Sequence, residues 1–200
     1  RAKLAKTILM AGVFVAAGYL LLLLAFSLAS SERVLGAGGQ KYFCEVDCHL
    51  AYSVVDVKTA KGLGAANPVT AAGTFYVVTL RTWFDEKTIS PRRGNGPLTP
   101  NPRMVRVVDD LGRGFAPSLE GLRALEIPQA KMIPLDQPLR PGESYETTFV
   151  FDLPADAHNP RLWVTDPLPV NRLLIGHENS FLHKKVYLSL ATAQPITGRL

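Results

Sequence analysis

The stretch Thr74–Phe84 reads TFYVVTLRTWF and is the strongest indicator of the fold. Aromatic and β-branched residues dominate it, and these residue types favour the extended backbone of a β-strand. Comparable short runs lie on both sides and are separated by turn residues, which is the pattern of an antiparallel sheet. These runs are His49–Thr59, Arg103–Val108, Arg113–Ala116, Glu143–Leu153, Arg161–Thr165 and Lys184–Leu190.

About seven strands, with one short helical segment at Ser118–Glu126, predict a mainly β protein. Long helices that alternate with strands, as a Rossmann-like enzyme needs, are missing from this pattern. The predicted fold is one N-terminal transmembrane helix followed by an antiparallel immunoglobulin-like β-sandwich.

Three segments resemble the immunoglobulin-like domains of bacterial envelope proteins: Gly73–Leu80, Val107–Arg113, and Leu139–Ser144 leading into Phe149–Pro154. The resemblance covers about Lys41–Leu190. It implies a membrane-anchored sandwich outside the membrane, in a group mostly of unknown function and without known enzymatic activity. We therefore expect no catalytic residues, no cofactor and no enzyme activity.

Ile8–Ala29 reads ILMAGVFVAAGYLLLLLAFSLA and contains no charged residue. As a helix it would be about 33 Å long, enough to cross a hydrocarbon core of about 30 Å. We predict a basic tail at 1–6, a transmembrane signal anchor at 7–30, a flexible linker at 31–40 and a β-sandwich domain at 41–200. A signal peptide that is cleaved after Ser27-Leu28-Ala29 is the alternative.

Arg1, Lys3 and Lys6 precede the span, so the positive-inside rule predicts a cytoplasmic N-terminus and a periplasmic sandwich at a bacterial inner membrane. Gly12 and Ala16 form a small-xxx-small pair that would let another membrane helix approach closely. The formal net charge is +5. Since the tail supplies three of these charges, the remaining balance argues against nucleic-acid binding.

Cys44-Glu45-Val46-Asp47-Cys48-His49 is the one arrangement that suggests a metal. The cysteines of a two-copper site have this spacing, but the further ligands of such a site are missing here. On the oxidising side of a membrane, Cys44 and Cys48 are expected to form a disulfide. In a continuous strand they would lie about 13 Å apart, so a disulfide requires the chain to turn between them. Free thiols and a copper or redox site that includes His49 stay open.

Other polar and aromatic residues have simpler interpretations. Asp109 and Asp110 are adjacent and are expected to form a turn rather than a catalytic pair. Trp83 and Trp163 each lie in a predicted strand and are expected to be core residues, with an aromatic platform for a partner as the alternative.

The loop Asp85–Pro102 is expected to be eighteen residues without regular structure, and such loops are usually functional or disordered. Its candidate partner-binding residues are Arg92, Arg93 and Pro97, and Arg172 is expected to extend the same surface. A solvated loop with no partner is the alternative.

The leading hypothesis is a non-enzymatic, single-pass accessory subunit of an inner-membrane complex, with residues 7–30 in the lipid bilayer. Respiratory and photosynthetic electron-transport complexes are natural hosts by analogy of architecture. A periplasmic copper-handling or redox protein that uses Cys44, Cys48 and His49 is the second hypothesis, and an envelope sensor or solute-binding module is the third.

Overall fold

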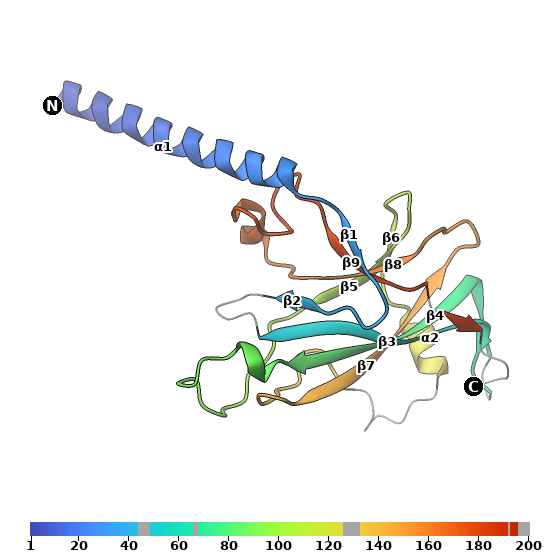
Figure 1. Cartoon of the computed structure of the whole chain (residues 1–200). Helices are drawn as coiled ribbons and strands as arrows, with labels where there is room; N and C mark the ends of the chain where they lie inside the picture. Colours follow the sequence, from blue (N-terminus) through green and yellow to red (C-terminus); the bar gives the residue numbers. More distant parts are fainter. Residues whose placement is uncertain (44–48, 66–67, 126–132, 192, 196–200) are drawn as a thin grey trace. The chain divides into compact units, whose positions relative to one another are not determined.

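The computed structural model describes residues 1–43, 49–65, 68–125, 133–191 and 193–195 (Figure 1). The chain folds as two compact units. One contains Arg1–Arg33 and Leu168–Val186, and the other contains Val34–Pro167 and Tyr187–Leu200.

The larger unit is a sandwich of two β-sheets (Figure 1). In the first sheet the strand order is β1 (Arg33–Leu35), β9 (Val186–Ser189), β8 (Arg161–Thr165), β5 (Met104–Val108), β6 (Gly114–Phe115). In the second it is β10 (Gln194–Pro195), β3 (Leu50–Leu63), β4 (Val69–Phe84), β7 (Ser144–Leu153), and β2 (Lys41–Phe43) also pairs with β3. The β3–β4 and β4–β7 pairs are antiparallel, whereas β10 pairs with β3 in parallel. The predicted β-sandwich is confirmed.

Strand β4 is the centre of the second sheet, and its alternation builds the core. Val78, Leu80 and Phe84 point inward and are fully buried. They pack with first-sheet side chains such as Val107 and Leu162 in one cluster. Burying one such side chain contributes about 1.5–3 kcal/mol, so this cluster holds the two sheets together.

A second, smaller cluster lies on the outer face of the second sheet. Helix α2 (Leu119–Ala124) covers Phe75, Val77 and Val150 there. The side chain of Ser118 caps the helix by accepting a hydrogen bond from the Gly121 N–H at 3.0 Å. Within the predicted segment Ser118–Glu126 a helix therefore forms at Leu119–Ala124, and it shields one patch of the sheet from water.

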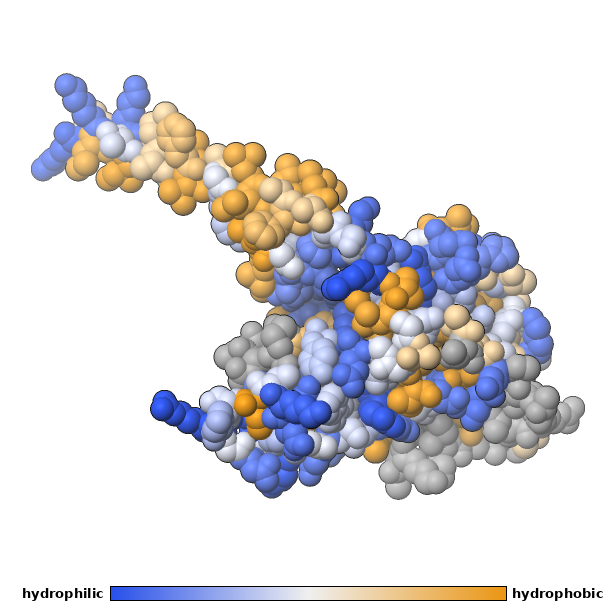
Figure 2. Space-filling view, viewed as in Figure 1, coloured by the Kyte–Doolittle hydropathy of each residue, from blue (hydrophilic) through white to orange (hydrophobic). Residues whose placement is uncertain are grey.

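Helix α1 (Ala2–Ala29) dominates the smaller unit. Its 28 residues are about 42 Å long, and they are long and apolar enough to cross a membrane. Figure 2 shows apolar side chains along most of its surface and hydrophilic ones at the N-terminal end. Leu168–Val186 lies in the same unit and contains a short 3-10 helix, η3 (Pro169–Leu173).

The structure differs from the sequence-based boundaries in three places. The segment 31–40, expected to be a flexible linker, contains β1, which pairs with β9. Helix α1 begins at Ala2 instead of near residue 7. Residues 168–186, expected within the sandwich domain, belong to the unit of α1. Short elements of two to five residues carry too little periodicity to be recognised in a sequence.

The close packing of β4 on the end of β7 gives a stability prediction. A Cβ atom on Gly73 would lie 2.4 Å from both the Leu153 carbonyl oxygen and the Ala155 nitrogen, and backbone cannot swing aside as a side chain can. We expect Gly73→Ala to destabilise the sandwich by about 1–3 kcal/mol in denaturant unfolding. The control is Gly114→Ala, where a Cβ would only meet the flexible Arg106 side chain at 3.8 Å. Equal stability of the two variants would contradict the described packing.

Candidate functional site

Two segments that the sequence marks as candidates meet at one end of the β3–β4 pair. Leu50 begins β3 and lies opposite Phe84, the last residue of β4. His49, which closes the cysteine-containing connection, accepts a hydrogen bond at its carbonyl from the Asp85 N–H at 2.8 Å. His49 and Asp85, the first residue of the loop 85–102, are therefore neighbours, although they lie far apart along the chain.

His49 is buried and only 4% exposed. It stacks on Phe84 with ring centroids 5.7 Å apart, and its Nδ1 lies 2.7 Å from the Thr88 hydroxyl. That hydroxyl also lies within hydrogen-bond distance of the Asp85 carbonyl, at 2.9 Å.

Asp85 organises the start of the loop. It is 5% exposed, and its carboxylate accepts hydrogen bonds from the Lys87 N–H at 3.0 Å and the Tyr42 hydroxyl at 2.8 Å. The first bond caps a short 3-10 helix, η1 (Glu86–Thr88). Burial, together with the hydrogen bond and negative charge of Asp85, raises the pKa of Tyr42 to about 12. Tyr42 is therefore a neutral hydrogen-bond donor at physiological pH.

The loop has more regular structure and more hydrogen bonds to neighbouring segments than the sequence predicts. The expectation of eighteen residues without regular structure is wrong at Glu86–Thr88, which form η1, and at Leu98, which forms a β-bridge with Leu139. Arg140 also donates a hydrogen bond to the Asn95 carbonyl at 3.0 Å. The tip of the loop is thus presented on a fixed base.

The two arginines of the loop have different surroundings. The Arg93 guanidinium lies 4.8 Å from the centre of the Phe84 ring and donates to the Gly96 carbonyl at 2.7 Å. Arg92 is exposed, and within the part of the chain that the structure describes its side chain makes no hydrogen bond or ion pair. Pro97 is exposed as well, whereas Arg172 lies in the unit of α1. Arg93 is therefore a structural contact, and Arg92 is the arginine available to a partner.

Two cationic side chains, Lys41 and Arg103, lie against the ring of Phe43 at the end of β2. Arg103 has a fully buried side chain, pairs with Asp166 at 3.1 Å and lies 4.3 Å from the centre of the Phe43 ring. Lys41 is 6% exposed and donates to the Val164 carbonyl at 2.7 Å. Breaking a buried pair of this kind is costly because it leaves an uncompensated charge, so Arg103 and Asp166 are best assigned a structural role.

The cysteines themselves lie outside the described residues. Phe43, at the end of β2, pairs with Leu50, at the start of β3, in antiparallel register. The disulfide stays a prediction. Among the described residues, no group of three His, Cys, Asp or Glu side chains could hold a metal ion.

Trp83 lies on the outward face of the second sheet and is not a core residue. It is half-buried and, with Arg81, lines a pocket of about 310 Å³. The other lining residues are Gly38, Gln40, Ala51, Ser53, Val55, Gly142 and Ser144. Trp163 is also half-buried and outside the core cluster. The expectation that both tryptophans are core residues is wrong, because alternation along β4 and β8 puts them on the outer faces.

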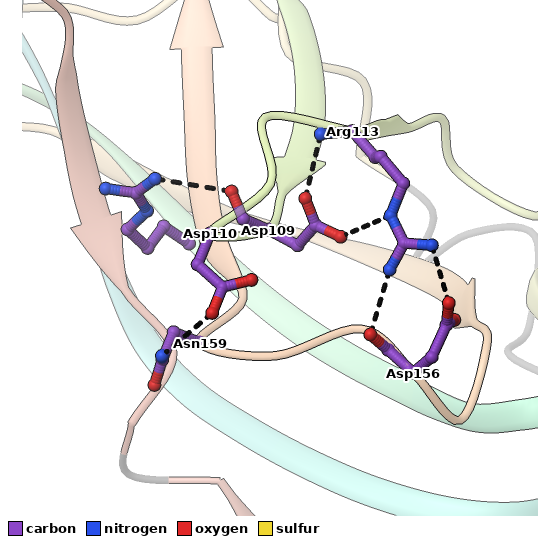
Figure 3. A network of polar contacts seen from close by, with 6 residues as sticks. Asp109, Asp110, Arg113, Asp156 and Asn159 are labelled. Atoms are coloured by element: carbon purple, nitrogen blue, oxygen red, sulfur yellow. Dashed lines mark hydrogen bonds and ion pairs between the residues drawn. The ribbon is translucent and has the colours of Figure 1, made fainter.

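A polar network at the β5–β6 turn has a structural character (Figure 3). Arg113 donates from Nε to the buried Asp109 carboxylate at 2.6 Å and from Nη1 to Asp156 at 2.8 Å. Asn159 donates to Asp110 at 3.3 Å. The expected turn role of Asp109 and Asp110 agrees with these contacts, which join the hairpin to the segment after β7.

The three comparisons with known proteins show no family. No protein-family model matches the chain, and no curated protein sequence is significantly similar to it. Among solved structures it is similar to the secreted protein MPT63 of Mycobacterium tuberculosis, with 12% identity, a TM-score of 0.47, and coverage of 80% of this chain and 97% of that one. The yjhA protein of Bacillus subtilis has 12% identity, a TM-score of 0.45, and coverage of 78% and 99%. An uncharacterized β-sandwich protein of Clostridium difficile 630 has 8% identity, a TM-score of 0.43, and coverage of 80% and 95%.

The Asp109 network predicts acid sensitivity. Burial opposes ionisation of Asp109, but the hydrogen bonds and charge of Arg113 outweigh it and hold the pKa of Asp109 below its ordinary value. The hydrogen bond and charge of Arg113 also lower the pKa of Asp156. A carboxylate with a lowered folded-state pKa stabilises the fold above its unfolded pKa of about 3.9, and this contribution is lost as pH falls through the folded value.

We therefore expect the melting temperature of the detergent-solubilised chain to fall as pH drops below about 4. Arg113→Gln should reduce this acid dependence, because it removes the charge that favours both carboxylates. Arg106→Gln, at an exposed position on β5, is the matched control. An unchanged acid slope in Arg113→Gln would show that the network does not contribute.

The cysteine prediction is tested by alkylation of the purified chain without reductant, followed by mass spectrometry. A disulfide leaves Cys44 and Cys48 unmodified, and reduction makes both reactive. Metal analysis of the same sample should find neither copper nor zinc. Copper near one per chain that is lost in Cys44→Ser would instead support the metal interpretation.

Proposed function

We propose that the chain is a single-pass protein of a bacterial inner membrane, with α1 in the bilayer, a cytoplasmic N-terminus and the sandwich in the periplasm. The observation that carries this proposal is the exposure of apolar side chains around α1. Leu9, Phe14, Val15 and Leu21 are 67–74% exposed. A helix that is apolar on every side is stable in lipid and not in water, so the bilayer is the environment that this surface fits.

Contacts of α1 favour a retained anchor over a cleaved signal peptide. Leu23 and Ser27 are the buried residues of α1, and the Tyr19 hydroxyl donates a hydrogen bond to the Leu173 carbonyl. Cleavage after Ala29 would remove the helix around which this unit is built. A signal peptide needs no such folded contacts, so they support an uncleaved anchor.

The sandwich is proposed to act as a non-enzymatic, immunoglobulin-like accessory module that docks on other subunits of a membrane complex. Arg92 supports this proposal because it is exposed at the tip of a loop whose base is pinned by η1 and the Leu98–Leu139 bridge. A loop that is already ordered loses less entropy when it binds. Respiratory and photosynthetic electron-transport complexes are the proposed hosts, by analogy of architecture alone.

The second candidate function is a periplasmic copper-handling or redox protein. The contact between His49 Nδ1 and the Thr88 hydroxyl, at 2.7 Å, supports this candidate. Metal-binding histidines characteristically donate one ring N–H to a neighbouring group while the other nitrogen binds the metal. Cys44 and Cys48 would supply the remaining ligands. The metal analysis described above separates this candidate from the accessory-subunit proposal.

Protease treatment of intact spheroplasts tests the proposed topology. Protease should digest the sandwich and leave a protected fragment that contains Arg1–Ala29, detected by mass spectrometry. Lysed spheroplasts that are treated in parallel are the control. Protection of the whole chain in intact spheroplasts would show that the sandwich is cytoplasmic.

The contrast between Arg92 and Arg93 tests the docking proposal. Arg92→Ala should leave the unfolding free energy within about 0.5 kcal/mol of the wild type, because the side chain touches little in the described structure. It should also weaken retention of partners during purification in mild detergent. Arg93→Ala should cost about 0.5–1 kcal/mol, since it removes the contact with Phe84. Full retention of partners by Arg92→Ala would show that the contact lies elsewhere.

A further inference from the structure

The segment Leu168–Val186, which we call the apolar lobe, has the reverse of the burial pattern of a water-soluble surface loop. Its large apolar side chains point outward and two of its polar residues are buried, while Arg172 and Lys184 are exposed. Phe181 and Leu182 are 53% and 66% exposed, whereas Asn171 and Ser180 are only 6% and 2% exposed. Leu168, Val170, Leu173 and Leu174 are also 45–59% exposed. Contiguous exposed apolar surface of this kind marks an interaction site.

The backbone of the apolar lobe satisfies many of its own hydrogen-bonding groups. Successive turns link Leu174 N–H to the Asn171 carbonyl at 3.3 Å, and Ser180 N–H to the His177 carbonyl at 2.9 Å. A bond between residues further apart in the sequence, from the Phe181 N–H to the Arg172 carbonyl at 3.3 Å, joins the two ends of this series of turns. Internal pairing of this kind is the condition that lets non-helical backbone leave water.

The apolar lobe lies beside the C-terminal part of α1, where it is drawn in orange-brown in Figure 1. Lys184 N–H donates to the Ser30 hydroxyl at 2.8 Å, and the Leu173 carbonyl accepts from the Tyr19 hydroxyl. Tyr19 lies ten residues before Ala29, which is about 15 Å of helix rise. The apolar lobe therefore runs alongside the last 15 Å of the helix that we propose to cross the bilayer.

We infer that the apolar lobe is immersed in the outer leaflet of the bilayer, with lipid as its partner. This inference rests on the proposed membrane anchoring of α1, since the outward apolar side chains of the lobe continue the apolar surface of that helix. Lys184 is exposed and adjoins Ser30 at the end of α1. Its charge at this position suits the anionic headgroups of phospholipids. The lobe thus widens a single-helix anchor into a broader membrane-embedded base.

A bend of the chain at Leu182 agrees with this assignment. Its φ of 63° is a left-handed conformation that is rare for residues other than glycine. Its side chain is nevertheless a large apolar one and is directed outward at 66% exposure. In water such a position favours glycine or asparagine, whereas in lipid a leucine gains apolar contact.

Fluorescence quenching in vesicles tests the inference with the full chain. We would introduce one additional tryptophan as Phe181→Trp in the apolar lobe, Phe14→Trp in α1, or Leu111→Trp at the exposed β5–β6 turn of the sandwich. Each variant is reconstituted in phosphatidylcholine–phosphatidylglycerol vesicles with and without brominated acyl chains. Subtracting the wild-type spectrum removes the common emission of Trp83 and Trp163.

Lipid immersion predicts that the added emission of Phe181→Trp and Phe14→Trp is blue-shifted and quenched by brominated lipid, whereas that of Leu111→Trp is neither. Quenching in Phe14→Trp without quenching in Phe181→Trp would overturn the lobe assignment and leave the anchor intact. Emission of Phe181→Trp that is blue-shifted but unquenched would show that protein covers the lobe, which also overturns it. Loss of quenching in both variants would overturn the membrane anchor as well.

Discussion

Shielding of apolar side chains from water is the constraint on which this molecule depends, and its two units meet it in different ways. In the sandwich, β4 turns Val78, Leu80 and Phe84 inward against the first sheet, and protein atoms cover them. In the unit of α1, apolar side chains face outward and the buried residues include Ser27, Asn171 and Ser180. The first arrangement is stable in water, and the second is stable in lipid. Under the proposed membrane anchoring, the division of the chain into two units coincides with a change of solvent.

Within the sandwich, the chemistry-bearing residues gather where β3 begins and β4 ends. The pairing of Leu50 with Phe84 brings His49 to Thr88 and Asp85, so His49 and the start of the arginine loop share one edge. Such an edge can present side chains without disturbing the core, because the strands behind it are held by the packing of β4. The same geometry suits a docking site built on Arg92 and a metal site built on His49, and these two proposals differ in which side chain meets the ligand.

Most of the fold could be predicted from the sequence, because the strands with strong alternation, above all Thr74–Phe84, show their inward face directly. The short strands Arg33–Leu35, Lys41–Phe43 and Gln194–Pro195 could not, since two or three residues define no period and tertiary pairing decides their conformation. The contacts of His49 could not be predicted either, because they depend on the register between β3 and β4. Arg92 and Arg93 are the same residue type, so the sequence does not indicate that only Arg93 packs on Phe84. Leu168–Val186 did carry a signal, a cluster of apolar residues without alternation, but its attachment to α1 is a long-range contact that only the structure reveals.

The central claim is that α1 is a retained, lipid-embedded part of the mature protein. Alkaline carbonate extraction of membranes, followed by intact mass measurement of the chain in each fraction, tests it most directly. The account predicts that the chain stays in the membrane pellet with Arg1–Ala29 attached, because carbonate removes peripheral proteins and not helices buried in hydrocarbon. A chain that is released to the supernatant and lacks these residues would contradict it, and α1 would then be a cleaved signal peptide.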